Sequence, residues 1–259
     1  MSVIIEVKNL TKIFGQKDNS VTALEGVNLT IKEGEFWVLV GSSGCGKTTL
    51  VNTIAGFERP THGQVLLHGE SVKGIDPRCG MIFQQYALFP WKTVVENVEF
   101  GLKMKRVKLS ERRKITQKYI DLVGLQGFEK HYPVQLSGGM KQRVSIARSL
   151  ANDPEIMLMD EPFAALDAMT RQVLQEELMR IYRESHKTIL FITHSIDEAL
   201  LLSTSIAVMT SRPGRIKDTL KNDLPWPRSA EVQLTDRYQE LKNSIWHSVQ
   251  EEVMRSIGL

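Results

Sequence analysis

The sequence predicts an α/β protein in which a largely parallel β-sheet carries an N-terminal antiparallel β-subdomain and an inserted α-helical subdomain. Three observations support this fold class. Short β-like runs separated by turns occupy residues 2–38. Strand and helix patterns then alternate around a glycine-rich loop, an arrangement typical of parallel sheets. Residues 86–152 are instead poor in glycine, dense in charge and helical in their periodicity.

The first half of the chain divides at its turn signals. Strands are expected in the runs IIEVKNL, VTALEGVNLTI and EFWVLV, the last of which follows Glu33-Gly34. A helix is expected from Lys47 onward (KTTLVNTIAG), and GQVLLHGE resembles a short edge strand. The segment after residue 86 then predicts three helical stretches, VENVEFGLKM, ERRKITQKYIDLVGL and KQRVSIARSLA.

The second half returns to alternating elements. EIMLMDEP is an apolar strand pattern, residues 171–185 form an amphipathic helix, and TILFITHS is a further strand. A last helix is expected to run to Gly258. Its apolar residues recur every four positions, at 241, 245, 249, 253 and 257. This stripe favours a helix packed on its own domain over a tail that binds a partner.

The composition excludes few classes of function. The hydrophobic share of 42% and the charged share of 24% are those of an ordinary globular protein, and the net charge of +3 argues for neither nucleic acid nor membrane as a partner. Cys45 and Cys79 are the only cysteines, and no secretory leader is recognisable, so we expect a reducing cytosol. The best apolar run, ALLLSTSIAVMTS, has 13 residues, whereas a membrane span needs about 20. The histidines are scattered without ligand spacing, so no structural metal is predicted.

A phosphate-binding loop is the strongest local signal. GSSGCGKT at residues 41–48 matches G-x-x-x-x-G-K-[ST], with a strand pattern before it and a helix pattern after it. The glycines let the backbone wrap the β- and γ-phosphates, Lys47 supplies a point charge, and the Thr48 hydroxyl can ligate Mg²⁺. The motif predicts a P-loop NTPase whose nucleotide contacts are Gly41, Ser42, Ser43, Gly44, Cys45, Gly46, Lys47, Thr48 and Thr49.

Two acids end the apolar run IMLMDE. Asp160 stands where a strand-terminal Asp completes the Mg²⁺ shell, and Glu161 stands where a carboxylate could activate water. His194 closes the later strand TILFITH, and Gln84 follows MIF. Taken alone, a strand-terminal histidine is more often structural than catalytic, and a glutamine is merely polar.

A second phosphate site is predicted at residues 136–143, LSGGMKQR. Its Gly-Gly turn runs into a basic helix, so exposed N–H groups and the positive end of the helix dipole would face an anion.

With these motifs in this order, the chain resembles the ATP-binding cassette (ABC) ATPases over nearly all of residues 3–215. LSGGxxQR is specific to that family among P-loop NTPases. The resemblance implies a RecA-like parallel-sheet core, ATP and Mg²⁺ as cofactors, and an ABC ATPase domain over residues 1–230. Its helical subdomain would span about 87–152, with a C-terminal helical tail over 231–259.

The resemblance also assigns roles. Phe14 corresponds to the aromatic residue that stacks on adenine, usually Tyr in the family, and Ala165-Leu166-Asp167 to the loop at the dimer interface. Two cassettes pack head to tail in this family, so Ser137, Gly138 and Gly139 would contact the ATP of the partner. The implied catalytic residues are Glu161, His194, Lys47 and Gln84, and the implied metal ligands are Thr48, Gln84 and Asp160.

The stretches FPWKTVVENV, EPFAALDAMTR, HSIDEAL and VMTSRPGRI resemble the nitrate/sulfonate/taurine branch of importers, which has bicarbonate relatives. That branch implies an ATPase at the cytoplasmic face of the membrane, bound peripherally. Its partners would be a second cassette (an identical or homologous chain), transmembrane permease subunits and, indirectly, a solute-binding protein, with no nucleic acid. A soluble ABC-type ATPase acting on a non-transport partner is the alternative. An unrelated P-loop motor or kinase would leave LSGGMKQR unexplained.

Two surface features each have two possible interpretations. Tyr86, Phe89 and Trp91 could line a groove for a helix of a partner or could belong to the internal core. The basic stretch from Lys103 to Lys118 is best interpreted as a solvated helical face, with contact to lipid headgroups or the permease as the alternative.

Overall fold

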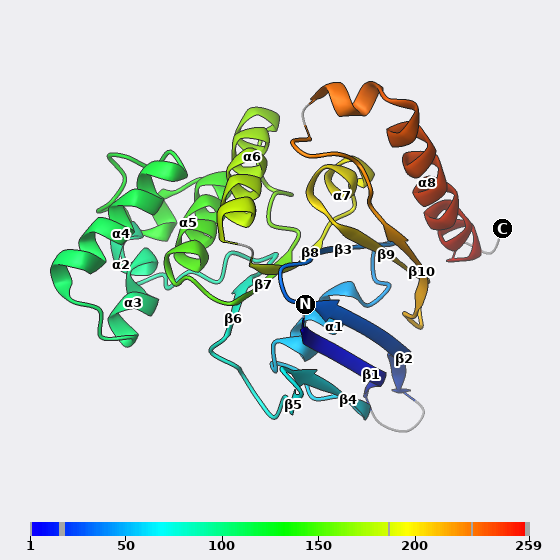
Figure 1. Ribbon diagram of the computed structural model, residues 1–259. Helices are drawn as coiled ribbons and strands as arrows, with labels where there is room; N and C mark the ends of the chain where they lie inside the picture. The colour runs from blue at the N-terminus through cyan, green and yellow to red at the C-terminus, as the bar shows by residue number, and fades with distance from the viewer. Residues whose placement is uncertain (1, 16–18, 186, 229, 257–259) are drawn as a thin grey trace. The chain divides into compact units, whose positions relative to one another are not determined.

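The chain divides into two compact units in the computed structural model, which describes residues 2–15, 19–185, 187–228 and 230–256 (Figure 1). The first unit is formed by residues 1–76 and 185–259, and the second by residues 77–184.

An antiparallel sheet opens the first unit. Its strands are β1 (Val3–Phe14), β2 (Val21–Lys32), β4 (His62–Leu67) and β5 (Glu70–Ser71), in the order β2-β1-β4-β5. Along the second half of β2, buried apolar residues alternate with exposed ones, as in a strand with one face on the core. The predicted antiparallel N-terminus is therefore confirmed. The prediction of an edge strand at GQVLLHGE was wrong, because β5 pairs with the outer side of β4.

A second set of strands in this unit is mainly parallel. β3 (Phe36–Val40) pairs in parallel with both β8 (Thr188–Ile192) and β9 (Ser205–Met209), and β10 (Ile216–Lys221) pairs antiparallel to β9. β8 is buried along its whole length, which matches its uninterrupted apolar sequence. Leu39 of β3 lies opposite Ile192 of β8, so the loops that follow these two strands emerge at the same edge of the sheet.

The second unit combines one parallel strand pair with helices. β6 (Cys79–Ile82) pairs with β7 (Ile156–Asp160), and the helices are α2 (Val94–Val98), α3 (Phe100–Met104), α4 (Leu109–Leu122), α5 (Gly138–Ala151) and α6 (Ala168–Ser185). A 3₁₀ turn, η2 (Pro133–Gln135), leads into α5. Helix α5 contacts α2, α3 and α4 and so forms the centre of this helical group (Figure 1). The helices predicted from periodicity are confirmed, although VENVEFGLKM forms two short helices rather than one.

Helices also complete the first unit. α1 (Lys47–Ile54) follows β3, α7 (Ile196–Leu202) follows β8, and a 3₁₀ segment η3 (Ala230–Leu234) leads into α8 (Asp236–Ser256). α8 contacts α7 and β9. Leu241 and Ile245 of the predicted stripe are buried, whereas Val253 is exposed. Ile257 and the predicted end at Gly258 lie outside the described residues.

The apolar run over residues 199–211 is divided between the end of α7 and the whole of β9, two elements that its local pattern did not separate. Across the described part of the chain, no helix is both long enough and apolar enough to cross a bilayer.

Candidate functional site

The glycine-rich loop between β3 and α1 encloses its own lysine. The ammonium group of Lys47 donates to the carbonyl oxygens of Gly41 at 2.8 Å and Ser42 at 3.0 Å, and it lies 3.8 Å from the Cys45 sulfur. Lys47 is buried, while Thr48 beside it is exposed at the start of α1. The loop thus holds a cation against main-chain carbonyls at the start of a helix. The N–H groups of a helix N-terminus and a nearby cation both favour an anion such as phosphate.

Two glycines of this loop have backbone conformations that other residues rarely adopt. Gly44 has φ +76° and Gly46 has φ +102°. A Cβ atom added to Gly46 would also lie 2.7 Å from Leu24 Cδ2 and 2.8 Å from the Ala23 carbonyl oxygen. Glycine at position 46 is therefore required both by backbone torsion and by the neighbouring strand.

His194 lies just beyond β8, at the sheet edge from which the glycine-rich loop also emerges. Its two neighbours are held in place. Thr193 Oγ1 donates to the Glu198 carboxylate and accepts from the Ser195 N–H at 3.0 Å, and Ser195 caps α7 by accepting from the Glu198 N–H at 3.2 Å. The His194 side chain itself is exposed. Thr193 and Ser195 carry no role predicted from the sequence, yet their hydrogen bonds fix the backbone that presents His194.

Phe14 ends β1 with 40% of its surface exposed, and the Lys12 ammonium lies 4.7 Å from the centre of its ring. The ring is therefore partly exposed, with a cation over one of its faces.

Arg212 also belongs to this region, although the sequence did not predict it as a site residue. Its guanidinium donates to the Gly44 carbonyl at 3.3 Å. Next to it, a Cβ atom on Gly214 would lie only 2.0 Å from the Cys45 carbonyl oxygen. The loop between β9 and β10 therefore packs tightly against the glycine-rich loop. Its Arg-Pro-Gly sequence was the available signal.

The second unit brings Gln84 and Glu161 together. β6 and β7 are parallel with Ile82 opposite Met159, so the residues following these strands emerge at one edge. The Gln84 side-chain amide donates to Glu161 Oε2 at 3.2 Å. Glu161 has φ +47°, an uncommon conformation for a non-glycine residue and one concentrated at functional sites. Asp160, at the end of β7, is 2% exposed.

The predicted second phosphate site is an exposed helix N-terminus. Ser137 is the N-cap of α5, and its hydroxyl accepts from the Met140 N–H at 3.3 Å. Gly138 and Gly139 form the first turn, where N–H groups have no acceptor within the helix. A Cβ atom on Gly138 would lie 2.9 Å from the Tyr86 hydroxyl, so glycine permits this close approach. Ser137 and Gly138 are both exposed, as contact with an anion requires.

Asp167 precedes α6, and its carboxylate accepts from the Thr170 N–H at 3.0 Å. This hydrogen bond from the Thr170 backbone lowers the pKa of Asp167, so the exposed side chain carries a negative charge at neutral pH.

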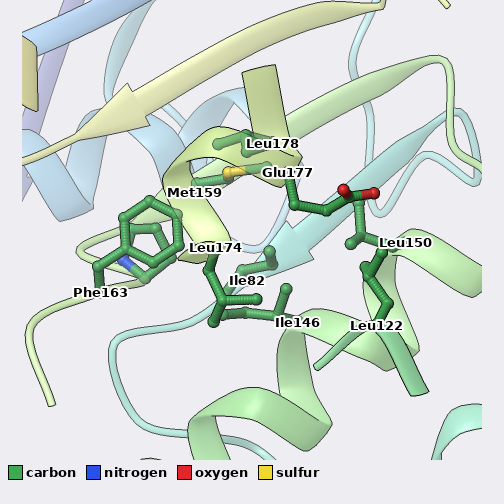
Figure 2. A pocket seen from close by; sticks show the side chains of 10 residues that line it. Ile82, Leu122, Ile146, Leu150, Met159, Phe163, Leu174, Glu177 and Leu178 are labelled. Atoms are coloured by element: carbon green, nitrogen blue, oxygen red, sulfur yellow. The ribbon is translucent and has the colours of Figure 1, made fainter. Parts of the chain in front are cut away.

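A small cavity in the second unit is apolar and differs in character from the site (Figure 2). Glu177 is the one charged residue in its lining, and that carboxylate pairs with Arg180. The cavity therefore offers no donors for phosphate. Its lining residues are Ile82, Leu122, Ile146, Leu150, Met159, Pro162, Phe163, Leu174, Glu177 and Leu178.

The site residues predicted from sequence thus fall into two groups. The glycine-rich loop, Phe14 and His194 belong to the first unit. The second unit holds Gln84, Asp160, Glu161, Ser137, Gly138, Gly139 and Asp167.

Comparison with known proteins identifies the family. The family described as ABC transporter matches residues 24–164. An ABC transporter ATP-binding protein of Methanocaldococcus jannaschii is 52% identical over 257 residues, which cover 99% of this chain and 95% of that protein. A taurine import ATP-binding protein of Pelagibacter ubique is 46% identical over 258 residues, covering 95% and 96%. An aliphatic sulfonates import ATP-binding protein of Bacillus cereus is 40% identical over 241 residues, covering 93% and 94%.

A solved structure is also similar to this chain. A dimeric ATP-binding cassette in a post-hydrolysis state, bound to ADP and Pi, superposes with a TM-score of 0.78 at 36% identity, over 84% of this chain and 98% of that chain. The predicted P-loop NTPase fold is thereby confirmed. The motifs, the fold and the relatives lead to one conclusion: this chain belongs to the ABC transporter family, as one of its ATP-binding cassettes.

Proposed function

We propose that this chain is the ATP-binding and ATP-hydrolysing subunit of an importer, and that it drives uptake of a small anion such as nitrate, a sulfonate, taurine or bicarbonate through a separate membrane permease. The observation that carries this proposal is similarity over almost the whole chain to taurine and sulfonate import ATP-binding proteins. The alternative, a soluble cassette ATPase acting on a non-transport partner, has no such observation in its favour.

The first unit would hold the nucleotide. Phe14 presents an exposed ring for the adenine, and residues 41–49 present main-chain N–H groups at the N-terminus of α1 for the phosphates. The Lys47 ammonium donates to loop carbonyls. Phosphate oxygens are stronger acceptors because they are charged, so Lys47 is expected to exchange these carbonyls for phosphate.

Three residues are proposed as Mg²⁺ ligands. Thr48, Asp160 and Gln84 offer a hydroxyl, a carboxylate and an amide oxygen, the hard oxygen donors that Mg²⁺ prefers. The donor set therefore fits the ion. When bound, Mg²⁺ would neutralise charge on the phosphate oxygens.

Glu161 is proposed as the base that polarises the attacking water. Gln84 donates to one of its oxygens and so fixes the direction of the carboxylate. His194, held outward by its two neighbours, would donate to the γ-phosphate where charge develops.

Ser137, Gly138 and Gly139 are proposed to contact the ATP of a second cassette, with Asp167 at the same interface. Support comes from the exposure of Ser137, Gly138 and Asp167 in the single chain and from the dimeric state of the solved relative. The partner would be an identical or a homologous chain. ATP would join the two cassettes and hydrolysis would release them, which shifts the population from closed to open dimers.

The permease is proposed to dock beside the segment from Gln84 to Trp91. Trp91 is 70% exposed, whereas Phe89 is half-buried against Phe100, with ring centres 4.6 Å apart. The segment therefore offers a supported aromatic surface. Docking would place the chain peripherally at the cytoplasmic face of the membrane, with a solute-binding protein as an indirect partner.

We also propose the division into an ATPase domain over residues 1–230, with a helical subdomain at about 87–152, and a C-terminal helical tail over 231–259.

The Glu161→Gln variant tests the catalytic assignment. It should bind ATP without turnover and elute as a dimer in gel filtration with Mg-ATP, because the amide cannot accept a proton from water. Glu184→Gln, on the exposed face of α6, is the matched control and should remain an active ATPase. A monomeric, fully active Glu161→Gln protein would refute the assignment.

The Ser137→Ala variant tests the contact across the dimer. It should lose hydrolysis while nucleotide affinity stays near that of the unmodified chain, whereas Lys47→Ala should lose affinity itself. Equal losses of affinity would contradict the assignment of Ser137 to the partner's nucleotide. Co-purification of the chain with permease subunits from membranes, followed by ligand screening of the associated binding protein, tests the transport function and identifies the solute.

A further inference from the structure

The segment that follows Gln84 is fastened to the helix that begins with Ser137. Arg148, three turns along α5, donates to the Ala87 carbonyl at 2.7 Å and to the Tyr86 carbonyl at 3.4 Å. Its guanidinium also lies 5.7 Å from the centre of the Phe89 ring. One side chain of α5 thus contacts three positions of the segment.

The surroundings of Arg148 are unusual for a cation. Burial lowers the pKa of the guanidinium, and within the described part of the chain its hydrogen-bond acceptors are main-chain carbonyls and no acidic side chain pairs with it. Burying a charge without a counter-ion is costly unless its hydrogen bonds are satisfied. Here two main-chain carbonyls and an aromatic face provide the compensation, so the position of the segment depends directly on this side chain.

Further contacts and backbone constraints hold the same segment in place. Ala87 has φ +46°, a left-handed conformation that persists in a non-glycine residue only where the surroundings impose it. The fully buried Asn97 of α2 accepts from the Phe89 N–H at 2.9 Å and donates to the Phe89 carbonyl at 3.2 Å. The Tyr86 hydroxyl lies against Gly138. The connection between β6 and α2, which contains this segment, is therefore held in place by contacts with α2 and α5.

We propose that Arg148 is a positioning residue that couples the N-terminus of α5, at residues 137–139, to the Gln84–Glu161 pair. A displacement of α5 that accompanies engagement of Ser137 would be transmitted through the Tyr86 and Ala87 carbonyls to Gln84, and so to the carboxylate of Glu161. This inference rests on the proposed function, since it assumes that Glu161 and Ser137 act in hydrolysis.

Arg148→Met tests the coupling, because methionine has a similar length and no donors. In the full chain, kcat for ATP hydrolysis should fall at least tenfold while KM for ATP changes less than twofold, since the nucleotide contacts of the first unit are untouched. Lys105→Met is the matched control. Lys105 also donates from a cationic side chain to a main-chain carbonyl, that of Asn152 beyond the far end of α5, and its variant should keep kcat within twofold.

Hydrogen exchange provides a readout that a merely structural role would not move. In the Glu161→Gln background, Mg-ATP should increase protection of residues 84–91, and Arg148→Met should abolish this increase while α5 itself stays protected. A normal ATP-dependent increase in the Arg148→Met protein, or a kcat within twofold of the unmodified chain, would overturn the coupling.

Should Arg148→Met not fold, Arg148→Lys decides, because lysine keeps the charge but lacks the planar fork that reaches two carbonyls. Its kcat should fall at least threefold, and an unchanged kcat would overturn the proposal. Failure of the proposed function is distinguishable: in that case Glu161→Gln by itself would neither hold ATP nor form a dimer, whatever residue occupies position 148.

Discussion

The phenol of Tyr238 anchors the C-terminal helix, and its removal gives a quantitative test. Tyr238 is 1% exposed, and its hydroxyl donates to Asp197 Oδ1 at 2.6 Å. Burial and then the neighbouring Asp197 raise the pKa of Tyr238, so the hydroxyl is protonated and donates at all physiological pH values. Asp197 lies in the first turn of α7, just beyond His194, so this contact ties α8 to the loop that presents His194.

The free energy of α8 docking that Tyr238→Phe should remove depends on the interactions that remain in the variant. A hydrogen bond to a charged group contributes about 1.5–3 kcal/mol. The Asp197 side chain is 48% exposed and keeps Lys242 at 2.7 Å, so water and the ammonium compensate for part of the loss. The ring stays, so no large cavity forms. We expect α8 docking to weaken by about 1–1.5 kcal/mol, the equivalent of about five- to twelvefold in an opening equilibrium.

Native-state hydrogen exchange of α8 measures this opening without requiring that the whole chain unfold in one step. Amide protection in α8 should fall about five- to twelvefold in Tyr238→Phe, by the arithmetic above. Trp246→Ala, on the exposed face of the same helix, should change protection less than twofold. Unchanged protection in Tyr238→Phe, or an equal loss in β1 and β2, would refute the reasoning, since the effect would then be absent or not local to α8.

Three further predictions follow from single contacts. Gly46→Ala should weaken binding of a fluorescent ATP analogue at least tenfold, and more than Gly44→Ala, because only the Cβ at position 46 meets atoms closer than 3 Å; equal effects would contradict this. Leu174→Ala should enlarge the apolar cavity and lower the free energy of unfolding by about 2–4 kcal/mol, measured as a reduced urea midpoint (Figure 2). An unchanged midpoint would contradict this, because the neighbouring side chains would then have filled the enlarged cavity. Burial raises the pKa of Asp197, but the hydrogen bonds from Lys242 and Tyr238 outweigh this effect, so the pKa is lowered overall. The contribution of the Asp197 carboxylate to the docking of α8 is therefore present above the pKa that Asp197 has in the unfolded chain. It is lost as the pH falls through the lower pKa that Asp197 has in the folded chain. The α8 protection, corrected for intrinsic exchange, should therefore drop at acid pH in the unmodified chain and not in Asp197→Asn.

Most of the candidate site residues could be proposed from the sequence because their signals are local. A phosphate-binding loop needs glycines at fixed offsets from a lysine, between a buried strand and a helix, and all of these lie within a few residues of one another. The strand-terminal Asp160 and Glu161 and the N-cap Ser137 are likewise recognised from their immediate neighbours. The helices over residues 94–151 follow from apolar periodicity, which depends only on the residues of each helix.

The features that the sequence did not resolve share a different cause. β4 was expected at an edge, but its place depends on β5, a two-residue strand too short to have a pattern of its own. The apolar run over 199–211 contains a helix end and a strand, and continuous apolar sequence does not show where one ends. Arg212 was not assigned to the site because its partner, the Gly44 carbonyl, lies 168 residues away in the chain.

The sequence by itself therefore determined which residues carry charge, which glycines free the backbone, and which family combines these motifs. Only the tertiary structure decided how the groups are joined. Strand pairing places Gln84 against Glu161, Arg148 holds the segment between Gln84 and α5, and Tyr238 secures α8 beside the loop of His194. The physical reason is that local patterns reflect torsion preference and burial, whereas contacts between distant residues depend on strand order and register, which no short stretch of chain specifies.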